Sequence, residues 1–502
     1  MKVKHWVDAH LAECYLFFML ALFPLIIHDF YFDITYTKYN FLIKVTIVFA
    51  IVTVVVREIE IGVYKSFFCA PPFLFYWLFL ISGVITTLLS TYRSDSFWGK
   101  AGRYNGWFTY LIYGIAFFIV FSQKKISYRT ILYYEIASVI VALLGILNYF
   151  SIDLFGFFTN LSGEAINSFT STMGNIDVFG EYISIFVVFT GVLSVMEKES
   201  KYMRIFHEVA YMFGIVALVT NRTDSAYIGL AILLLAMPFF MSNYREVRRW
   251  MRLCIYFFIT CIGLGYTYGQ IPIAKQLDGL SLLLSKKYNL LSVLLIGVLL
   301  CYIALSIIEK KRREECNINS LVKKVYVVIC SGTIILFILC ILVVNLFGNA
   351  QYENGIFKKM VFTDMSGSGR GLLWRIALEH YAELPFLQKI FGIGADTLRY
   401  IYEQESVQMS VLEKEYDNVH NFYLQLLVGQ GIAGVTLFVV WLVSIWKKML
   451  TQVKEKPIFL ATFLGTLAYF AEAAVGIHLI NSSAIAMLMM SLIGVEIVRK
   501  RG

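Results

Sequence analysis

The sequence predicts an all-α polytopic membrane protein with about 12–14 transmembrane helices and one large extracytoplasmic loop. Of its 502 residues, 59% are hydrophobic and 15% are charged, and the mean hydropathy is +0.71. A soluble domain does not carry such a composition. The net charge of +9 does not indicate nucleic-acid binding, because the basic residues recur in short clusters between apolar runs, as the positive-inside rule expects.

Apolar runs long enough to cross a bilayer recur along the whole chain. A span needs about 20 mostly apolar residues, and runs near this length occur at 11–32, 37–56, 67–90, 107–122, 130–150, 178–196, 208–220, 224–241, 253–271, 289–308, 325–347, 420–446, 457–476 and 480–498. The run at 208–220 is short for a full crossing. We expect no cleavable signal peptide, because the first run is long and many more follow it. One integral membrane domain, residues 1–502, is predicted.

The basic clusters orient the chain in the bilayer. Dense groups such as those at 198–204 and 245–252 fall between spans on one side, which the positive-inside rule assigns to the cytoplasm. Both termini are then cytoplasmic, and the polar segment 348–419 becomes a large external loop inserted between two spans. We expect the chemistry of the protein at this outer face.

The external loop is predicted to contain an amphipathic helix at 371–384. Leu372 and Ile376 share an apolar face opposite Arg375, at the spacing of a helix that packs one side against an apolar surface. Pro385 ends the helix. Such a helix fits either on the outer membrane surface or against the bundle.

Several side chains in the outer segments are candidates to bind phosphate. Arg103, Arg222 and Arg370 together indicate a cationic cavity for a diphosphate, because guanidinium groups bind phosphate oxygens bidentately. Each also has a plainer reading, since Arg103 and Arg222 could anchor to lipid headgroups and Arg370 could be a solvated loop residue. Arg375 and Asn175 are further candidate substrate-binding residues.

His420 opens a predicted span directly after the acidic part of the loop. It is either an interfacial polar residue or a functional one. In the functional reading it is a general base or a donor to phosphate, with Asp417 or Asn421 orienting its ring. Glu181 and Glu472 lie inside predicted spans and need partners, which could be the outer arginines, or they could relay protons in a transporter.

Neither a metal ion nor another cofactor is expected. The loops contain no acidic DxD cluster, and the eight cysteines form no CxxC pattern, which also argues against a disulfide framework.

The spacing of these residues resembles the O-antigen ligase and polymerase superfamily, which includes Wzy-type polysaccharide polymerases. The strongest match is the pattern H-N-x9-G-x-x-G, preceded by R-x3-W and a G-x-G turn. These patterns are met by His420, Asn421, Gly431, Gly434, Arg370, Trp374, Gly392 and Gly394. The segment STMGNIDVFGEYIS resembles a second family pattern, S-T-x-G-N-x-N-x-x-A-x-Y, with Asp177 where another Asn is usual. A T-x-S-R pattern is met only loosely at 220–222. The resemblance covers roughly residues 90–445.

The resemblance implies a metal-independent, inverting glycosyltransferase at the outer face of the bacterial cytoplasmic (inner) membrane. The donor would be a glycan on undecaprenyl diphosphate. An acceptor hydroxyl would attack the anomeric carbon, and the lipid diphosphate would leave. Arg222 and Arg370 would bind the diphosphate and stabilise the leaving group. Arg103 would help to hold the donor, and His420 would be a base or a phosphate contact.

The acceptor separates activities that the sequence leaves open. A polymerase uses a second lipid-linked repeat unit, whereas a ligase uses a lipid or protein acceptor. Richness in Ile, Lys and Tyr is typical of a low-GC genome, which favours a capsule or wall polysaccharide and hence the polymerase. A lipid-linked oligosaccharide flippase has similar spans but needs polar residues along a path through the bilayer. A shape-and-division peptidoglycan polymerase would need Asp417 or Asp177 as its catalytic acid. The lipid bilayer and a chain-length regulator are further expected partners, and nucleic acid is not.

Overall fold

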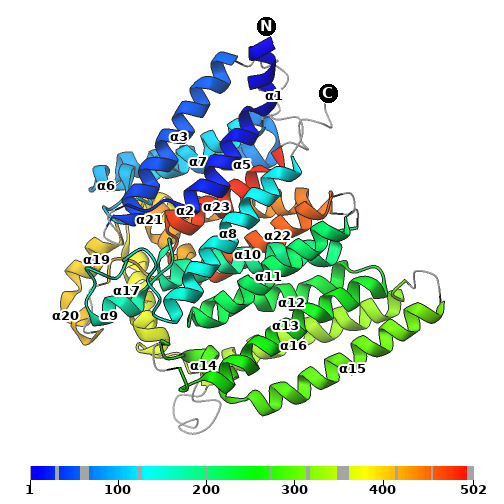
Figure 1. Cartoon of the computed structure of the whole chain (residues 1–502). Coiled ribbons are helices and arrows are strands. Elements are labelled where there is room, and N and C mark those ends of the chain that lie inside the picture. The colour runs from blue at the N-terminus through cyan, green and yellow to red at the C-terminus, as the bar shows by residue number, and fades with distance from the viewer. Residues whose placement is uncertain are drawn as a thin grey trace.

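A computed structural model of the chain shows a bundle of helices with a small helical cap at one end (Figure 1). The structure describes residues 2–28, 33–56, 67–121, 127–198, 200–271, 274–312, 317–347, 361–412, 416–453 and 456–494. Residues 348–360 of the predicted external loop lie outside the described residues. So do the ends of three predicted spans, at 29–32, 122 and 495–498.

Nine helices within the described residues are long and apolar enough to cross a membrane. They are α3 (Ile34–Val56), α5 (Pro71–Leu89), α8 (Tyr128–Tyr149), α10 (Ile176–Met196), α11 (Lys201–Thr220), α13 (Tyr244–Thr267), α15 (Tyr288–Arg312), α16 (Ser320–Phe347) and α21 (Phe422–Leu450). The predicted fold class, an all-α polytopic membrane protein, is confirmed. The run at 208–220 proves to be the end of the 20-residue helix α11, so the apolar run alone underestimates this helix.

Shorter apolar helices accompany the long ones and account for the remaining predicted spans. They are α1 with η1 and α2 (Lys2–Phe17, Phe18–Leu22 and Phe23–Leu25), α7 (Trp107–Phe121), η2 with α12 (Asp224–Ala226 and Tyr227–Phe240), α22 (Pro457–Glu472) and α23 (Ile480–Ser491). Local chemistry sets several helix starts. The side chains of Ser127 and Asn243 accept N–H groups of the first turns of α8 and α13, as N-cap residues do. Pro457 occupies the first turn of α22, where its missing N–H costs nothing.

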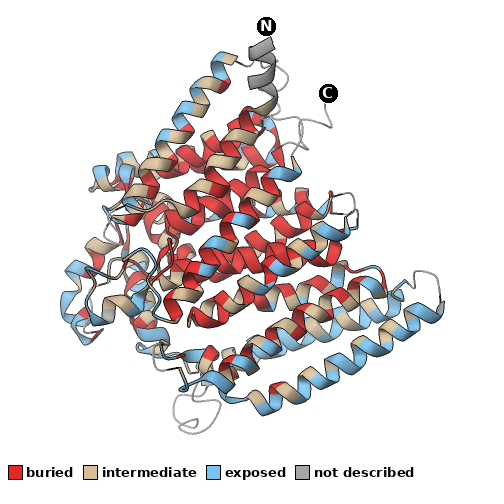
Figure 2. Cartoon of the chain, in the orientation of Figure 1, coloured by how far each residue is buried: buried red, intermediate tan, exposed pale blue. Residues whose placement is uncertain are grey.

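Helix α10 lies at the centre of the bundle, and α15 and α16 lie at its edge. Every residue of α10 from Val178 to Met196 is buried, and its main neighbours are α22 and α11. Only 6% of the most apolar windows of α15 and α16 is buried inside the protein, and Figure 2 shows α15 coloured mainly as exposed or intermediate. A helix that is apolar on all sides must be covered by protein or by lipid, so these two helices present lipid-facing surfaces.

Short elements gather where α21 begins, which we call the large-loop end of the bundle (Figure 1). The cap there consists of α17 (Ser366–Glu383), α18 (Phe386–Phe391), α19 (Arg399–Gln404), α20 (Ser406–Met409) and η4 (Ser410–Leu412). The other short elements are α6 (Arg93–Trp98), α9 (Gly163–Ser168), the antiparallel strands β1 (Phe169–Thr170) and β2 (Gly174–Asn175), and α14 (Gly279–Lys286).

The predicted amphipathic helix is confirmed as the main part of α17. Its regular turns begin at Arg370, because Gly367, Ser368 and Gly369 have left-handed backbone angles. Its apolar face, which includes Leu372 and Ile376, is buried in a separate apolar cluster with α19, η4 and the first turns of α21. The helix therefore packs against the protein and positions the residues at the start of α21.

Candidate functional site

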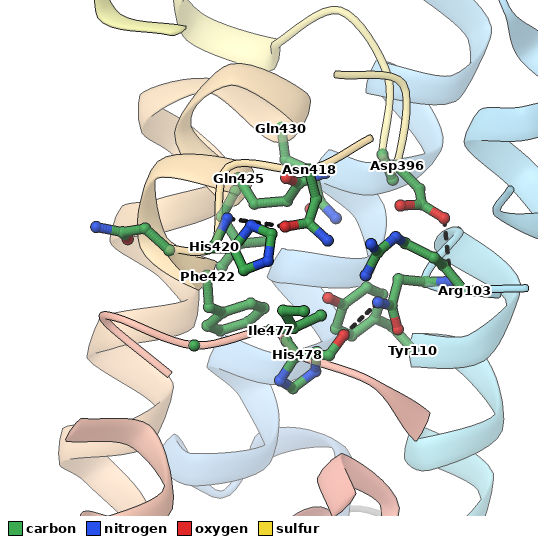
Figure 3. Close-up of a pocket in the computed structure, with 15 residues that line it drawn as sticks. Arg103, Tyr110, Asp396, Asn418, His420, Phe422, Gln425, Gln430, Ile477 and His478 are labelled. Carbon is green, nitrogen blue, oxygen red and sulfur yellow. Dashed lines mark hydrogen bonds between the residues drawn. The ribbon is translucent and has the colours of Figure 1, made fainter. Parts of the chain in front are cut away.

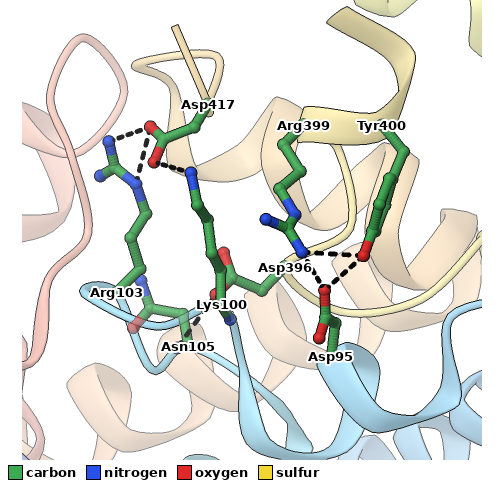
Figure 4. Close-up of polar contacts among 8 residues, drawn as sticks. All are labelled: Asp95, Lys100, Arg103, Asn105, Asp396, Arg399, Tyr400 and Asp417. Atoms are coloured by element: carbon green, nitrogen blue, oxygen red, sulfur yellow. Dashed lines mark hydrogen bonds and ion pairs between the residues drawn. The ribbon is translucent and has the colours of Figure 1, made fainter. Parts of the chain in front are cut away.

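Hydrogen bonds join two distant parts of the chain at the large-loop end. The hydroxyl of Thr86 donates to the carbonyl of Phe391, and the hydroxyl of Ser90 donates to the carbonyl of Ile393 at 2.6 Å. Asp95 of α6 accepts hydrogen bonds from Arg399 at 2.5 Å and from Tyr400 at 2.7 Å (Figure 4). These contacts dock the end of α5 and helix α6 against residues 391–400.

Asp396 fixes the turn that follows α6. Its Oδ2 accepts the backbone N–H of Lys100 at 2.7 Å and that of Asn105 at 3.4 Å. Burial raises the pKa of Asp396 to about 6, although the two N–H donors and the charge of Arg103 oppose the shift. Asp396 itself has a left-handed φ of +56°, a conformation that costs free energy in a residue with a side chain. The two hydrogen bonds to Asp396 therefore fix the geometry of the 100–105 turn.

This turn presents two cations to a single carboxylate (Figure 4). Lys100 Nζ lies 2.8 Å from Asp417 Oδ2, and Arg103 donates from Nε to Oδ1 at 2.9 Å and also from Nη2. Burial acts to raise the pKa of Asp417, but the hydrogen bonds and charges of Arg103 and Lys100 outweigh it and hold the pKa well below its usual range. Two positively charged side chains therefore share one carboxylate, Asp417.

His420 lies in the loop just before α21 and is held in a strained conformation. Its φ is +49°, and its backbone N–H donates to Asn418 Oδ1 at 2.8 Å. Burial and the charges of Arg370 and Arg103 lower the pKa of His420 to about 4, so the imidazole is neutral at pH 7. Its Nδ1 is buried without a hydrogen-bond partner in the described part of the chain.

The expected orientation of the His420 ring by Asp417 or Asn421 is not seen. Asp417 is engaged with Lys100 and Arg103. The Asn421 side chain caps α21 by accepting the N–H of Leu424 at 3.0 Å. The Asn418 side chain instead accepts the backbone N–H of His420, and the Tyr416 ring lies edge-on to the imidazole with a centroid distance of 5.6 Å.

Helix α17 braces the loop that carries His420. Trp374 Nε1 donates to the carbonyl of Val419 at 2.9 Å. Arg370 is four residues earlier and so lies on the same face of the helix. The charge of Arg370 acts on both His420 and Asp177, and Arg370 forms no hydrogen bond or ion pair within the described residues. The R-x3-W spacing thus places a cation, Arg370, and a hydrogen-bond donor, Trp374, beside the same loop.

Two glycines let the backbone of the cap approach α21 closely. A Cβ on Gly392 would lie 2.2 Å from the carbonyl oxygen of Gly429, and one on Gly431 would lie 2.2 Å from that of Ile390. Gly431 has a φ of +67° and interrupts the helical conformation of α21. Gly431 thus admits the backbone of α18 and kinks α21 at the same position.

These elements enclose a cavity beside His420 (Figure 3). It is lined by Arg103, Asn105, Tyr110, Ala395, Asp396, Asn418, His420, Asn421, Phe422, Gln425, Leu426, Gln430, Gly476, Ile477 and His478. The His478 ring stacks on Phe422 with a centroid distance of 4.1 Å, and its Nδ1 lies 2.8 Å from the hydroxyl of Tyr469. Burial lowers the pKa of His478 to about 3, so this second histidine is a neutral wall of the cavity.

The structure brings most, but not all, of the predicted site residues together. Arg103, Asn421 and His420 line the cavity, Asp417 binds Arg103, and the charge of Arg370 acts on His420. The other three candidates, Arg222, Asn175 and Arg375, are not among the lining residues.

Arg222 lies in a different polar group at the large-loop end. Its Nη2 donates to the carbonyl of Asn167 at 2.7 Å, and its φ is +68°. Burial lowers the pKa of Arg222, and the charges of Asp278 and Tyr149 oppose this shift. Nearby, Lys275 donates to the carbonyl of Ile166 at 2.6 Å. Two cations thus hold consecutive carbonyls of α9.

Asn175 and Arg375 have local partners. The Asn175 side chain caps α10 by accepting the N–H of Asp177 at 2.7 Å. Arg375 is on the exposed face of α17, where it forms ion pairs with Asp364 at 3.0 Å and Glu379 at 3.2 Å. Both side chains are engaged outside the cavity lining, so the predicted role of each in binding substrate has no support from their position.

The buried carboxylates of the bundle have hydroxyl partners. Glu181 accepts a hydrogen bond from Ser482 at 2.5 Å, and Glu472 accepts one from Ser225 at 2.9 Å. The outer arginines are not among these partners. Among the described residues, no group of three or more His, Cys, Asp or Glu side chains could hold a metal ion.

The cavity residues that sequence reasoning missed include Asp396, Asn418, Gln430 and His478. Weak signals existed for three of these. Asp396 follows the G-x-G turn, Asn418 is two residues before His420, and His478 lies in a polar break between the last two spans. Gln430 sits inside an apolar span, where its neighbours gave no indication of a cavity.

Residues 290–439 match the family model described as O-antigen ligase. The match runs from α15 into α21 and includes Arg370 and His420. No curated protein matches the chain. The fold is that of a polytopic membrane protein, and the match over residues 290–439 supports a glycan-processing function of the ligase and polymerase type. The match confirms, over these residues, the resemblance to the O-antigen ligase and polymerase superfamily.

Proposed function

We propose that the protein is a membrane glycosyltransferase that polymerises glycan repeat units carried on undecaprenyl diphosphate. The observation that carries this proposal is a neutral, partly unsatisfied histidine in a cavity with cations beside it. The family match supports glycan processing of the ligase and polymerase type. Donor, acceptor and mechanism are those that the family resemblance implies, and the chemistry of the site permits them.

The cations suit the diphosphate of the donor. Lys100 and Arg103 share the single charge of Asp417, and Arg370 has no ion-pair partner among the described residues. Guanidinium and ammonium groups bind phosphate oxygens through charge-assisted hydrogen bonds. Preorganised cations also stabilise the negative charge that develops on a leaving diphosphate. We therefore assign Arg370, Arg103 and Lys100 to the donor diphosphate, and Arg222 remains a predicted second contact.

His420 accepts the proton of the acceptor in this proposal. The acceptor oxygen forms a bond to the anomeric carbon, the bond from that carbon to the diphosphate oxygen breaks, and the diphosphate leaves with the electron pair. The hydroxyl proton passes to the neutral imidazole of His420. A bound diphosphate would offset the charges of Arg370 and Arg103, two of the causes that lower the pKa of His420, so donor binding would make the imidazole a stronger base. One displacement inverts the anomeric configuration.

A ligase is the second candidate, and the description of the matching family favours it. It would use the same donor and the same cavity but would transfer the glycan to a lipid or protein acceptor.

The proposal places the site on the outer face of the bacterial cytoplasmic membrane, with both termini in the cytoplasm. The basic clusters at 198–204 and 245–252 support this orientation through the positive-inside rule. Residues 1–502 then form one integral membrane domain with 348–419 as an external loop. A chain-length regulator in the same membrane is a predicted partner.

The test supplies purified protein with a lipid-diphosphate-linked repeat unit as the sole substrate, with a metal chelator present, and separates the products on a gel. A ladder of longer lipid-linked glycans supports the polymerase. Transfer that appears only after a lipid or protein acceptor is added supports the ligase instead. If neither condition gives transfer, while the protein moves the lipid-linked glycan across vesicles, the enzyme proposal fails and a flippase replaces it.

A further inference from the structure

Two carboxylates contact the turn that follows α6, and they contact it in different ways (Figure 4). Asp396 is 7% exposed and accepts the backbone N–H groups of Lys100 and Asn105. Asp417 instead contacts the charged ends of the Lys100 and Arg103 side chains. Asp396 therefore fixes the backbone of the turn, and the shape of the turn does not depend on Asp417.

The Asp417 carboxylate binds the two cations in the way that a phosphate group does. Its Oδ2 accepts from Lys100 Nζ at 2.8 Å, and its Oδ1 accepts from Arg103 Nε at 2.9 Å and also from Nη2. Guanidinium and ammonium donors on separate oxygens are typical of sites that bind carboxylate or phosphate. Burial opposes ionisation of Asp417, but the hydrogen bonds and charges of the two cations hold its pKa well below its usual range. Asp417 is therefore an anion at neutral pH.

This group of three charges is partly open to solvent. The side chains of Lys100, Arg103 and Asp417 are 27%, 16% and 29% exposed. Ion pairs that water reaches contribute little to stability, because solvent screens them. Exchange of one anion for another at these cations therefore costs little. A diphosphate has more negative charge and more acceptor oxygens than a carboxylate, so it can replace Asp417 there.

We infer that Asp417 is an internal competitor for the diphosphate of the donor at Lys100 and Arg103. This inference rests on the proposed function and adds a control of donor affinity to it. Binding of the diphosphate replaces the ion pairs of Asp417, and release of the diphosphate restores them. Asp417 thereby also limits how tightly the same cations retain the lipid diphosphate after transfer.

The loop that carries Asp417 has other contacts that hold it in place. Asn418 Oδ1 accepts the backbone N–H of His420 at 2.8 Å, and Trp374 Nε1 donates to the carbonyl of Val419 at 2.9 Å. Neither contact involves the Asp417 side chain. Displacement of Asp417 thus requires a rotation of its side chain and leaves His420 in position.

Direct binding of undecaprenyl diphosphate to the purified full-length protein tests the inference without any transfer. Asp417→Asn keeps the size of the side chain and removes its charge. We expect the Kd for undecaprenyl diphosphate to fall about tenfold, because the charge-assisted hydrogen bonds of Asp417 no longer compete. Isothermal titration calorimetry in detergent measures this Kd.

Asp95→Asn is the matched control. Asp95 accepts hydrogen bonds from Arg399 at 2.5 Å and from Tyr400 at 2.7 Å, and the side chains of Asp95 and Arg399 are each 25% exposed. This ion pair is as exposed as that of Asp417, but neither Arg399 nor Tyr400 is among the residues that line the cavity. The Kd for undecaprenyl diphosphate should be unchanged in this variant.

A double-mutant cycle separates competition from repulsion at a distance. If Asp417 and the diphosphate compete for Arg103, the gain in affinity from Asp417→Asn should shrink when Arg103 is replaced by Gln, because competitor and ligand lose the same partner. A gain that keeps its full size in Arg103→Gln would mean that Asp417 repels the ligand without being displaced, and this result would overturn the inference.

The same titrations distinguish failure of the inference from failure of the proposed function. A wild-type protein that binds undecaprenyl diphosphate, with a Kd that is equal or higher in Asp417→Asn, would overturn the inference and make Asp417 a structural ion-pair partner. Asp417→Ser repeats the measurement in case Asp417→Asn does not fold. A wild-type protein that does not bind undecaprenyl diphosphate would refute the proposed function itself.

Discussion

Two polar regions at the large-loop end use similar residue types for different purposes. In the upstream region, residues 171–175 and 220–223, side chains bind the backbone of the fold. Ser171 donates to the carbonyl of Val141, and Thr172 donates to that of Pro24, both at 2.7 Å. In the downstream region, residues 370–374 and 417–430, Arg370 forms no hydrogen bond or ion pair within the described residues, and His420 Nδ1 is buried without a partner there. The upstream region also holds one such buried atom, Asn221 Oδ1, so the two regions differ in having an unpaired cation beside a neutral histidine and not in unpaired atoms alone.

The largest expected effect tests the downstream region directly. His420→Ala should lower transfer by about 1,000-fold, because a positioned general base contributes about 100- to 10,000-fold. Initial rates with saturating donor and acceptor measure this. His380→Ala, on α17 and outside the cavity lining, should retain the wild-type rate. Normal transfer by His420→Ala would remove this histidine from the mechanism.

Arg370 and Arg375 allow a functional and an exposed position to be compared within one helix, α17. Arg370→Ala should lower transfer about 100-fold, because a preorganised cation stabilises the leaving diphosphate. Arg375→Ala should change the rate less than about twofold, because exposed ion pairs contribute little. Equal losses in both variants would show that the two faces of α17 do not differ in function.

A pH profile adds an independent readout of Arg370. Its charge helps to lower the pKa of His420 to about 4, and the neutral form of the histidine is therefore retained down to about that pH. Removing the charge should raise this pKa. The acidic limb of kcat/KM, which reports the free enzyme, should move to higher pH in Arg370→Ala and stay in place in Arg375→Ala.

Arg222 tests whether the upstream region is only structural, because it is the upstream residue with a predicted role in donor binding. Its left-handed φ of +68° is a strain that glycine does not feel. Arg222→Gly thus relieves strain while losing the hydrogen bond to Asn167, and thermal stability should change little. If Arg222 contacts the diphosphate, the KM for the donor should rise about tenfold. An unchanged donor KM would leave the upstream region purely structural.

Asp396 should give the smallest effect on transfer. Asp396→Ala removes the acceptor of the Lys100 N–H, which should misplace Arg103 and lower transfer roughly fivefold, a loss of about 1 kcal/mol. Asp396→Asn keeps an acceptor oxygen and should retain activity. A loss of equal size in both variants would assign a role to the charge itself.

Stability against pH tests the same carboxylate. The pKa of Asp396 is raised from 3.8 to about 6 in the folded protein, so the folded state binds more protons between these values. Stability should therefore fall as pH rises through this window, by an amount of the order of 3 kcal/mol. Melting temperatures of Asp396→Asn should lack this component, and identical pH dependence in both proteins would contradict it.

The sequence by itself determined the membrane class, the spans and the amphipathic helix. These features depend on local hydropathy and periodicity, which any stretch of about 20 residues displays without reference to the rest of the chain.

Tertiary structure alone decided which polar residues share a site. The turn with Lys100 and Arg103 meets Asp396 and Asp417, which follow Lys100 by 296 and 317 residues, and Arg222 falls outside the cavity that it was expected to join. Contacts of this kind depend on how helices pack, which residue spacing does not encode. Whether a buried polar atom finds a hydrogen-bond partner also depends on the neighbours around it, and only the packed fold determines these neighbours.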